Sequence, residues 1–429
     1  MTLTRLILKL KDYFFSGSAR LASIASQFLL IAALGNTGAL DLIGFWGPFT
    51  SFILVAVVFL NVGQSASSYI QIPPLVKSKH LDEARAVSGQ ILNKNLWWGL
   101  ALTPVIACFA YLNFRSLPLT ALVTLIALLL SFGETSAALL RSLNRIILSE
   151  IVKNTAWRSF VLIAILLLAR AAYNIDSNVL ALLLAAAALM QTIAIFIYFK
   201  PKITLSRLSG GKAGNGGVDI QNWMIQCLQS LNQNLDVILV ALIFSPAQTA
   251  IYFLATRLTS IIAIPLSVTN PVITPIFSLI SKNGVSDELS KRVTLNSGLN
   301  ILVSFLIGGL LFFFADPVAS FLAGEQVSVR ELFIVLAFGQ IINAVLGPTM
   351  QISQLFNFRK PIVILQIISL LIVILSAVIA YRSQTILAFA YGITAGRILL
   401  HVGVAIFLAR AENINILTGA HIVRRAAKY

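Results

Sequence analysis

The chain has 429 residues, of which 58% are hydrophobic and 11% are charged, and its mean hydropathy is +0.91. Soluble domains mix apolar and polar residues almost equally, so this composition excludes a soluble fold. The formal net charge of +16 resides in short connections between apolar runs, where basic residues set membrane topology, and it does not indicate nucleic-acid binding.

At the N-terminus, residues 1–19 predict an amphipathic helix that lies on the membrane surface. Leu3, Ile7 and Leu10 alternate with Arg5 and Lys9 at helical spacing. A cleavable signal peptide would place its basic residues ahead of an unbroken apolar core, so we do not interpret this segment as one.

Runs of about 20 apolar residues recur along the rest of the chain, and each can cross a hydrocarbon core of roughly 30 Å. The fold class is therefore all-α, a polytopic membrane protein with about 12 transmembrane helices. We predict these helices near residues 20–37, 45–66, 95–113, 118–140, 155–173, 177–199, 221–244, 249–278, 296–315, 330–355, 361–381 and 385–409.

Basic residues are concentrated in alternate connections between these helices. One side holds Arg5, Lys9, Lys11, Arg20, Lys77, Lys79, Arg85, Lys94, Arg141, Arg145, Lys153, Lys200, Lys202, Arg207, Lys212, Lys282, Lys291, Arg292, Arg359, Lys360, Arg410, Arg424, Arg425 and Lys428. The other side holds only Arg115, Arg170, Arg330 and Arg382. The positive-inside rule then places both termini in the cytoplasm.

A glycine-rich stretch, Ser209 to Gly217, has the composition of a flexible linker between the sixth and seventh helices. It is not a phosphate-binding loop, because Ser206 and Ala213 stand where that motif needs Gly and Ser or Thr. We predict an interfacial segment at 1–19, a six-helix bundle at 20–199, a cytoplasmic linker at 200–220, a second six-helix bundle at 221–409 and a cytoplasmic tail at 410–429.

The two halves carry weakly similar patterns, which indicate parallel repeats with a binding site between them. Gly44-Phe45-Trp46 opens the second helix much as Ala250-Ile251-Tyr252 opens the eighth. Asn61 and Gln64 then fall opposite Ser267 and Asn270.

Charged groups inside a bilayer are costly, so each needs a partner or a water-filled cavity. Asp236 and Arg257 lie about 10 and 11 residues from the Ser245-Pro246 turn, which puts both roughly 15 Å below it. We expect these two residues to form an ion pair, which either lines a cavity or fixes the packing of two helices.

Further candidates lie on faces of predicted helices. Arg397 and His401 are one turn apart. We expect Arg397 to bind an anion, and the alternative is a packing role. His401 either transfers protons or packs between helices. Glu134, Arg158 and Arg20 face the same cavity or extend their side chains to the interface. The amides that either bind a hydroxyl-rich ligand or join helices are Gln226, Gln229, Gln233, Asn61, Gln64 and Asn343.

No pattern of catalytic residues or metal ligands is present in the sequence. There is no Ser-His-Asp order and no His-Glu-x-x-His, and the 3 histidines are far apart. Cys108 and Cys227 fall in predicted helices, where a thiol serves as a small packing residue. We therefore expect no enzymatic activity, no metal site and no cofactor.

Three stretches carry a resemblance to a known family. Asn234 to Val240, followed by Ala250 to Leu258, resembles the seventh and eighth spans of the polysaccharide-exporter branch of the MOP superfamily, although Ala250 replaces the usual Gly. Leu336 to Pro348 looks like span ten of the same branch. The resemblance covers nearly the whole chain and implies a MATE-like fold.

The resemblance further implies a Wzx-type flippase that moves undecaprenyl-diphosphate-linked oligosaccharide across a bacterial cytoplasmic membrane. Arg20, Arg257 and Arg397 would then bind the diphosphate, while Asn61, Asn343 and the glutamine residues would bind sugar. Asp236 or Glu134 would titrate if H+ or Na+ drives transport. A polysaccharide polymerase, a chain-length regulator and membrane lipids would be its partners.

Other functions fit the same span pattern. A multidrug antiporter of the superfamily would extrude organic cations, but such pumps tend to carry an acidic residue in the cavity of the first half, and the first predicted helix has none. A lipid II flippase would need two more helices than the chain can supply. A non-transporting membrane scaffold of a polysaccharide assembly complex is a third alternative.

Overall fold

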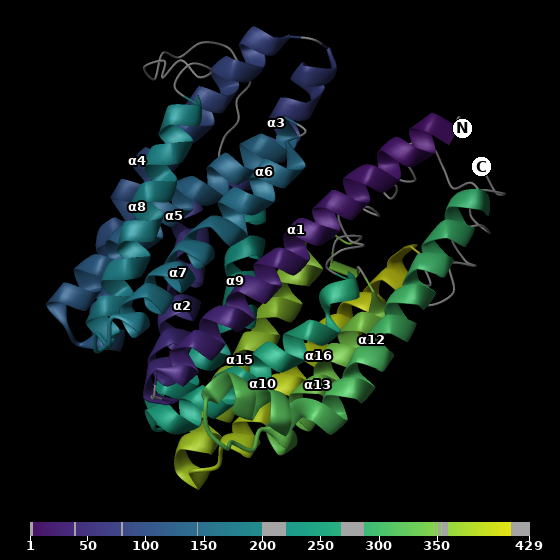
Figure 1. Ribbon diagram of the computed structural model, residues 1–429. Coiled ribbons are helices and arrows are strands. Elements are labelled where there is room, and N and C mark those ends of the chain that lie inside the picture. The colour runs from purple at the N-terminus through teal and green to yellow at the C-terminus, as the bar shows by residue number, and fades with distance from the viewer. Residues whose placement is uncertain are drawn as a thin grey trace. The chain divides into compact units, whose positions relative to one another are not determined.

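The computed structural model describes residues 3–37, 40–78, 80–143, 145–199, 220–266, 287–347, 349–350, 353 and 359–412. Within these ranges, chiefly at 3–17 and 287–297, some residues are described by their backbone alone. The described elements are all helices, and no strand occurs among them (Figure 1). They form two compact units, Met1–Ser230 and Leu231–Tyr429, and the boundary falls inside one helix.

Unit 1 is built around one central helix, α5 (Leu117–Ser142). It contacts α2 (Leu40–Asn61), α3 (Gln64–Lys77), α4 (Leu81–Phe114) and α8 (Ser177–Phe199). The remaining elements are α1 (Leu3–Asn36), α6 (Ile146–Glu150), a π-helical turn η1 (Ile151–Thr155), α7 (Ala156–Arg170) and the first part of α9 (Ile220–Ile243). Because every neighbour presents an apolar face, α5 is almost continuously buried along its second half.

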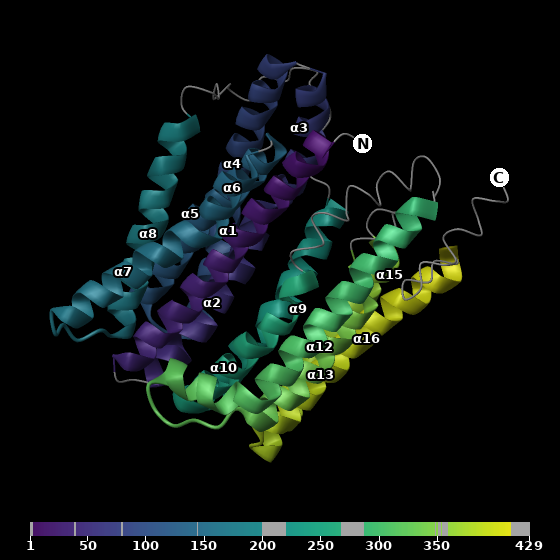
Figure 2. The same cartoon turned by 45° about the vertical axis from the view of Figure 1, so that its right-hand side comes forward.

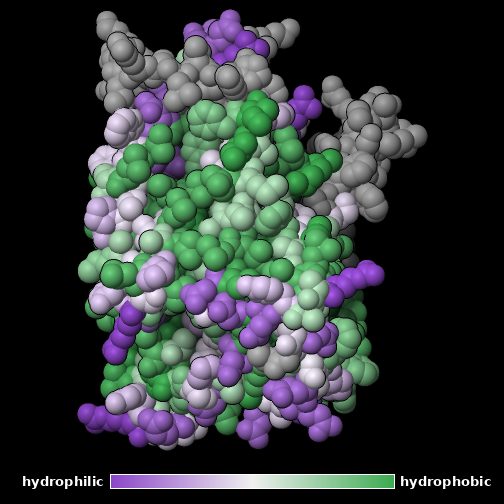
Figure 3. Space-filling model, turned by 60° about the vertical axis from the view of Figure 1, so that its left-hand side comes forward, coloured by the Kyte–Doolittle hydropathy of each residue, from purple (hydrophilic) through white to green (hydrophobic). Residues whose placement is uncertain are grey.

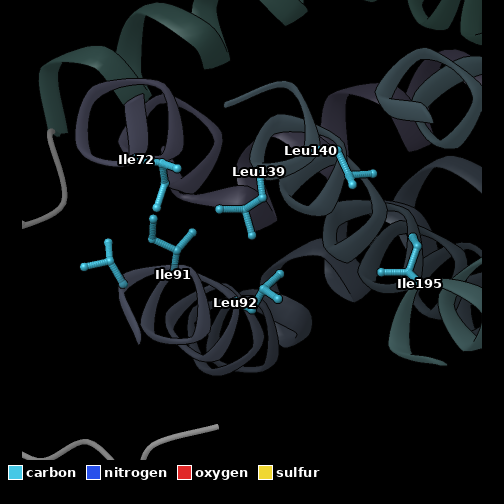
Figure 4. Close-up of a cluster of buried hydrophobic side chains, with 7 residues drawn as sticks. Ile72, Ile91, Leu92, Leu139, Leu140 and Ile195 are labelled. Atoms are coloured by element: carbon cyan, nitrogen blue, oxygen red, sulfur yellow. The ribbon is translucent and has the colours of Figure 1, made fainter. Parts of the chain in front are cut away.

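A cluster of aliphatic side chains fixes α3, α4, α5 and α8 together at one end of unit 1. Figure 4 shows Ile72, Ile91 and Leu139 turned toward a common centre, with Leu140 and Ile195 beside them. All five are nearly or fully removed from solvent. Close packing of this kind holds the helices in one arrangement and so defines the framework from which the polar residues of α5 project.

Unit 2 has α13 (Arg330–Leu346) at its centre, in contact with α10 (Pro246–Ile262), α12 (Asp287–Ala323) and α16 (Ile386–Glu412). The helix α15 (Arg359–Ser383) packs along α16, as Figure 2 shows. This approach is close because α16 carries glycine at the contact. A Cβ atom on Gly392 would lie 2.0 Å from Ser376 Cβ, and one on Gly396 would lie 3.1 Å from Ser369 Oγ.

Eight helical segments among the described residues are long and apolar enough to cross a membrane. They lie on α2, α4, α5, α6 with α7, α8, α12, α15 and α16, and the other four predicted crossings coincide with α1, α9, α10 and α13. Large apolar side chains such as Phe313 (70% exposed) point outward, and hydrophobic residues cover a broad area of the face in Figure 3. The predicted fold class, an all-α polytopic membrane protein, is confirmed.

Several predicted boundaries are wrong. The helix expected at 45–66 is two helices, because Val62 and Gly63 adopt left-handed backbone conformations with φ of 47° and 73° between α2 and α3. The helix expected at 330–355 ends at Leu346, where Gly347 has φ of 69°. Residues 1–19 do not form a separate helix, since α1 runs without a break from Leu3 to Asn36.

Other predictions fall outside the described residues. These are the glycine-rich linker from residue 200 to residue 219, the end of the helix expected at 249–278, and Ser267 and Asn270 of the proposed repeat. The side chain of Arg20 is also outside the description, although its backbone belongs to α1.

Candidate functional site

The densest group of charged side chains inside the helices of unit 2 is centred on Asp236. Its carboxylate is 2% exposed, and its Oδ2 accepts hydrogen bonds from Arg397 Nη2 at 3.1 Å and Tyr252 Oη at 3.2 Å. Its Oδ1 accepts from the backbone N–H of Val237 at 2.9 Å. Three helices, α9, α10 and α16, therefore meet at one carboxylate, and each contributes one residue to the contact.

The position of Arg397 depends on how closely α16 approaches α13. Thr394 Oγ1 donates to the backbone oxygen of Val335 at 2.9 Å, which ties the two helices together one turn before Arg397. A Cβ atom on Gly339 would lie 3.4 Å from Thr394 Cγ2 and 3.8 Å from Arg397 Cβ. Glycine at this point thus lets α13 lie against the turn that carries the arginine.

The expected ion pair between Asp236 and Arg257 is wrong, because Arg397 is the partner of Asp236. Tyr252 and Arg257 are five residues apart on α10, which rotates them about 140° from each other around the helix. Tyr252 points at Asp236, so Arg257 points elsewhere. Its guanidinium lies 4.6 Å from the ring centre of Phe253, one turn earlier.

Arg257 has no carboxylate partner among the residues that the structure describes. Its Nε atom is buried without a hydrogen-bond partner, which is costly for a charged donor. Asp236, Arg257 and Arg397 together comprise two guanidinium groups and one carboxylate. These three side chains of unit 2 therefore carry one more positive than negative charge.

Two uncharged polar side chains of unit 2 also end without partners. The Nδ1 atom of His401, one turn after Arg397, is buried and makes no hydrogen bond to a described residue. Gln366 on α15 is 0% exposed, and neither Oε1 nor Nε2 is bonded within the described part of the chain. Gln366 was not among the residues predicted from the sequence, although a glutamine inside the most apolar candidate span was a signal that could have identified it.

The amides predicted on α9 and in unit 2 differ in how far they are buried. Asn343 Nδ2 donates to Gln340 Oε1 at 3.4 Å, one turn earlier on α13. Gln226 and Gln229 are half-buried, whereas Gln233 is exposed. Asn343 is likewise half-buried, so of these four amides only Gln233 is exposed.

In unit 1, Asn61 joins helices. Its Nδ2 donates to Ser65 Oγ at 3.0 Å and to Thr135 Oγ1 at 2.6 Å, and its Oδ1 accepts from the backbone N–H of Ser65 at 3.0 Å. Gln64 is buried beside it, and its Nε2 lies 3.5 Å from the backbone oxygen of Val62. These amides stabilise the break between α2 and α3 and tie it to α5.

The embedded carboxylates of unit 1 have basic partners. Glu134 accepts from Lys153 Nζ at 2.5 Å, and Glu150 pairs with Arg141. Arg158 Nη1 donates to Ser23 Oγ at 2.9 Å, and its guanidinium lies 4.9 Å from the Trp157 ring centre. These contacts join α1, α5, α6, η1 and α7.

No protein-family model matches the chain, and no curated protein matches its sequence. Solved structures do match its fold. An inward-facing multidrug resistance MATE family transporter of the MOP superfamily aligns with a TM-score of 0.68 over 95% of this chain and 96% of that one, at 14% identity. The MATE transporter VcmN of Vibrio cholerae aligns with a TM-score of 0.63 over 95% and 97%, at 14% identity.

A third structure is a MOP superfamily transporter from Pyrococcus furiosus, for which the reverse polarity of the binding pocket suggests a different function. It aligns with a TM-score of 0.65 over 98% of this chain and 97% of that one, at 14% identity. At such identities the likeness establishes the fold alone. The chain has the fold of the MATE transporters of the MOP superfamily.

Proposed function

We propose that this chain is a membrane transporter that moves an anionic amphiphile, a polyprenyl-diphosphate-linked oligosaccharide, across the bacterial cytoplasmic membrane. The observation that carries this proposal is the positive balance of the Asp236, Arg257 and Arg397 group within unit 2. Charges inside a membrane protein are expensive and are retained where they contact a transported ion or each other. Arg257, which has no carboxylate partner among the described residues, is suited to bind an anion of the substrate.

A diphosphate suits these guanidinium groups chemically. Arginine offers several N–H donors in a planar fork that matches phosphate oxygens, and such charge-assisted hydrogen bonds are among the strongest in proteins. An organic cation would meet a net positive charge at the same place. In unit 1, the carboxylates that could attract a cation, Glu134 and Glu150, are already neutralised by Lys153 and Arg141.

The oligosaccharide needs amides and hydroxyls rather than charges. Gln366 has free donors and acceptors inside unit 2, and Asn343 keeps further bonding capacity beside Gln340. The lipid tail would stay in the bilayer while the two halves alternate in access to the two sides, which is how repeat-built transporters work. Coupling to H+ or Na+ would require a carboxylate that changes partners, and Asp236 is the carboxylate at the proposed site.

The alternative is a multidrug antiporter, since the fold is shared with multidrug transporters. The two functions differ in the charge of the substrate, and Arg257 separates them. A cation transporter gains from the loss of Arg257, whereas a transporter of diphosphate lipids loses its main free cation.

The experiment is mass spectrometry of polyprenyl-linked lipids from cells that lack this protein and retain their glycosyltransferases. We expect a complete diphosphate-linked repeat unit to accumulate, shielded from the outer face of the membrane. The native protein and Arg382→Ala, a change at an exposed arginine near the end of α15, should clear it, whereas Arg257→Ala should not. If no such lipid accumulates and the cells become sensitive to cationic dyes instead, the antiporter is the correct function.

A further inference from the structure

Asp236 stands beside Arg397 where the anion of a substrate would bind, although it belongs to the protein. We infer that Asp236 is an internal counter-anion, which competes with the transported anion for Arg397 and thereby weakens binding enough for release. The inference rests on the proposed function, because it concerns an anionic substrate at the same site. In this role Asp236 sets how tightly Arg397 binds the substrate, in addition to neutralising the charge of Arg397.

The first support is that Asp236 is held in place independently of Arg397. Tyr252 donates to its Oδ2 at 3.2 Å, and the backbone N–H of Val237 donates to its Oδ1 at 2.9 Å. Tyr252 is itself fully buried, and its ring centre lies 5.8 Å from that of Phe389. The carboxylate therefore keeps its position whether or not the arginine leaves.

The second support is that Arg397 is only partly engaged. A guanidinium has five N–H donors, and the pair with Asp236 uses Nη2 alone, with no other hydrogen bond from this side chain to a described residue. The side chain of Arg397 is 17% exposed, whereas that of Asp236 is 2% exposed. Arg397 thus keeps donors for a further anion and is more exposed than the aspartate that it pairs with.

The third support is electrostatic. An unneutralised guanidinium group inside the helices would bind a diphosphate very tightly, because charge interactions are strong where water is excluded. A transporter must bind its substrate firmly enough to select it and weakly enough to let it go. A fixed carboxylate next to the bound diphosphate repels it and offsets the positive charge of Arg397, which favours release.

The test measures binding and transport of a short-chain polyprenyl-diphosphate probe with purified protein, comparing the native chain with Asp236→Asn. Asparagine keeps the size and can still accept from Tyr252, but it lacks the charge. We expect about tenfold tighter binding, a lower KM and a lower kcat, because release becomes slow. Arg397→Ala should bind more weakly than the native chain, and Arg330→Ala, at an exposed arginine over Phe312, should match it.

Unchanged or weaker binding by a folded Asp236→Asn protein would overturn the inference. If Asp236→Asn does not fold, it is replaced in the test by the double variant Asp236→Asn with Arg397→Gln, which leaves no unpaired charge at this contact. The double variant should bind about tenfold more weakly than the native chain, and binding equal to the native chain would identify the pair as purely structural. If the native protein itself neither binds nor moves the probe, the proposed function fails, whatever Asp236 does.

Discussion

Single residues determine how unit 2 tolerates charge inside apolar helices. Arg397 donates one hydrogen bond to Asp236 at 3.1 Å, and Tyr252 supplies a second hydrogen bond to the same oxygen. Breaking such a buried pair from one side is far more costly than replacing both partners, because the remaining charge has no compensation. Substitutions at Asp236 and Arg397 should therefore be tolerated best when both residues lose their charge together.

Gln366 predicts a trade between stability and transport. Gln366→Leu removes an amide that is fully buried and unbonded within the described residues, so it should raise the free energy of unfolding by about 1 to 3 kcal/mol. It should also slow transport, because the free amide is proposed to bind substrate. Thermal unfolding in detergent and a transport assay measure the two effects.

Gln384→Leu is the matched control for that substitution. Gln384 lies at the exposed end of α15, and its Nε2 donates to the backbone oxygen of Tyr381 at 2.6 Å. Replacing it should bring no gain in stability. A loss of stability in Gln366→Leu would show that the buried amide is already satisfied, against our interpretation.

For Asn61 we predict a loss of stability without a change in substrate binding. Asn61→Leu leaves Thr135 and Ser65 without their partner in a buried place, which should lower the free energy of unfolding by about 1 to 3 kcal/mol. The KM for substrate per folded protein should not change, since the structure uses this amide to join α2, α3 and α5. Thr135→Val should be partly non-additive with it in thermal unfolding. An altered KM at normal stability would instead place Asn61 in the binding site.

At the level of residues, the sequence predicted which charged side chains are embedded but not which of them contact one another. Depth along a helix follows from counting, so Asp236, Arg257 and Arg397 were recognised as embedded charges. The direction in which each side chain points around its helix axis decides its partner, and this direction depends on how the helices pack. Tyr252 points toward Asp236, and this excludes Arg257 from the contact.

At the level of elements, α15 and α16 show how closely two helices can approach when one carries glycine. Gly392→Ala should force them apart, because the new Cβ would lie 2.0 Å from Ser376 Cβ and 3.5 Å from Ser376 Cα. We expect a loss of about 1 to 3 kcal/mol in unfolding free energy, as for other overpacked contacts. Thermal unfolding measures it, and Ser376→Gly should restore part of the loss in the double variant.

The chain offers a control for this prediction in α12. A Cβ atom on Gly309 would meet nothing within 4 Å. Gly309→Ala should therefore leave stability unchanged or raise it by up to about 1 kcal/mol, since alanine is the better helix former. Equal effects at Gly309 and Gly392 would refute the close approach of α15 and α16.

The existence of the long helices was predictable because a bilayer demands long apolar segments with internally satisfied backbones. Their interruptions were not predicted. The apolar run of α2 ends at Asn61, and Gly63 and Gln64 follow, so the predicted helix at 45–66 passed over a composition that allows a turn. The turn depends on Asn61, Ser65 and Thr135, which meet only after α5 has packed against α2.

At the level of the whole molecule, two compact units share one helix, with their boundary between Ser230 and Leu231 of α9. The first part of α9 packs in unit 1, where the Trp223 and Phe59 ring centres lie 6.4 Å apart. The second part carries Asp236 in unit 2. Any movement of α9 that accompanies transport would therefore act on the carboxylate directly.

The chain shares its fold with MATE transporters at 14% identity, because the fold depends on helix length, apolar faces and small residues at contacts. Substrate charge depends instead on a few polar side chains. In unit 2 Asp236 pairs with Arg397, and in unit 1 the embedded carboxylates Glu134 and Glu150 pair with Lys153 and Arg141.

The most direct test of the proposed function is a transport measurement in proteoliposomes with two substrates in parallel, a labelled polyprenyl-diphosphate oligosaccharide and a fluorescent organic cation. We predict that the native protein moves the diphosphate lipid between leaflets and does not move the cation. Arg257→Ala should reduce lipid transport by about tenfold or more, whereas Arg382→Ala should not. Transport of the cation alone, unaffected or improved by Arg257→Ala, would contradict the account.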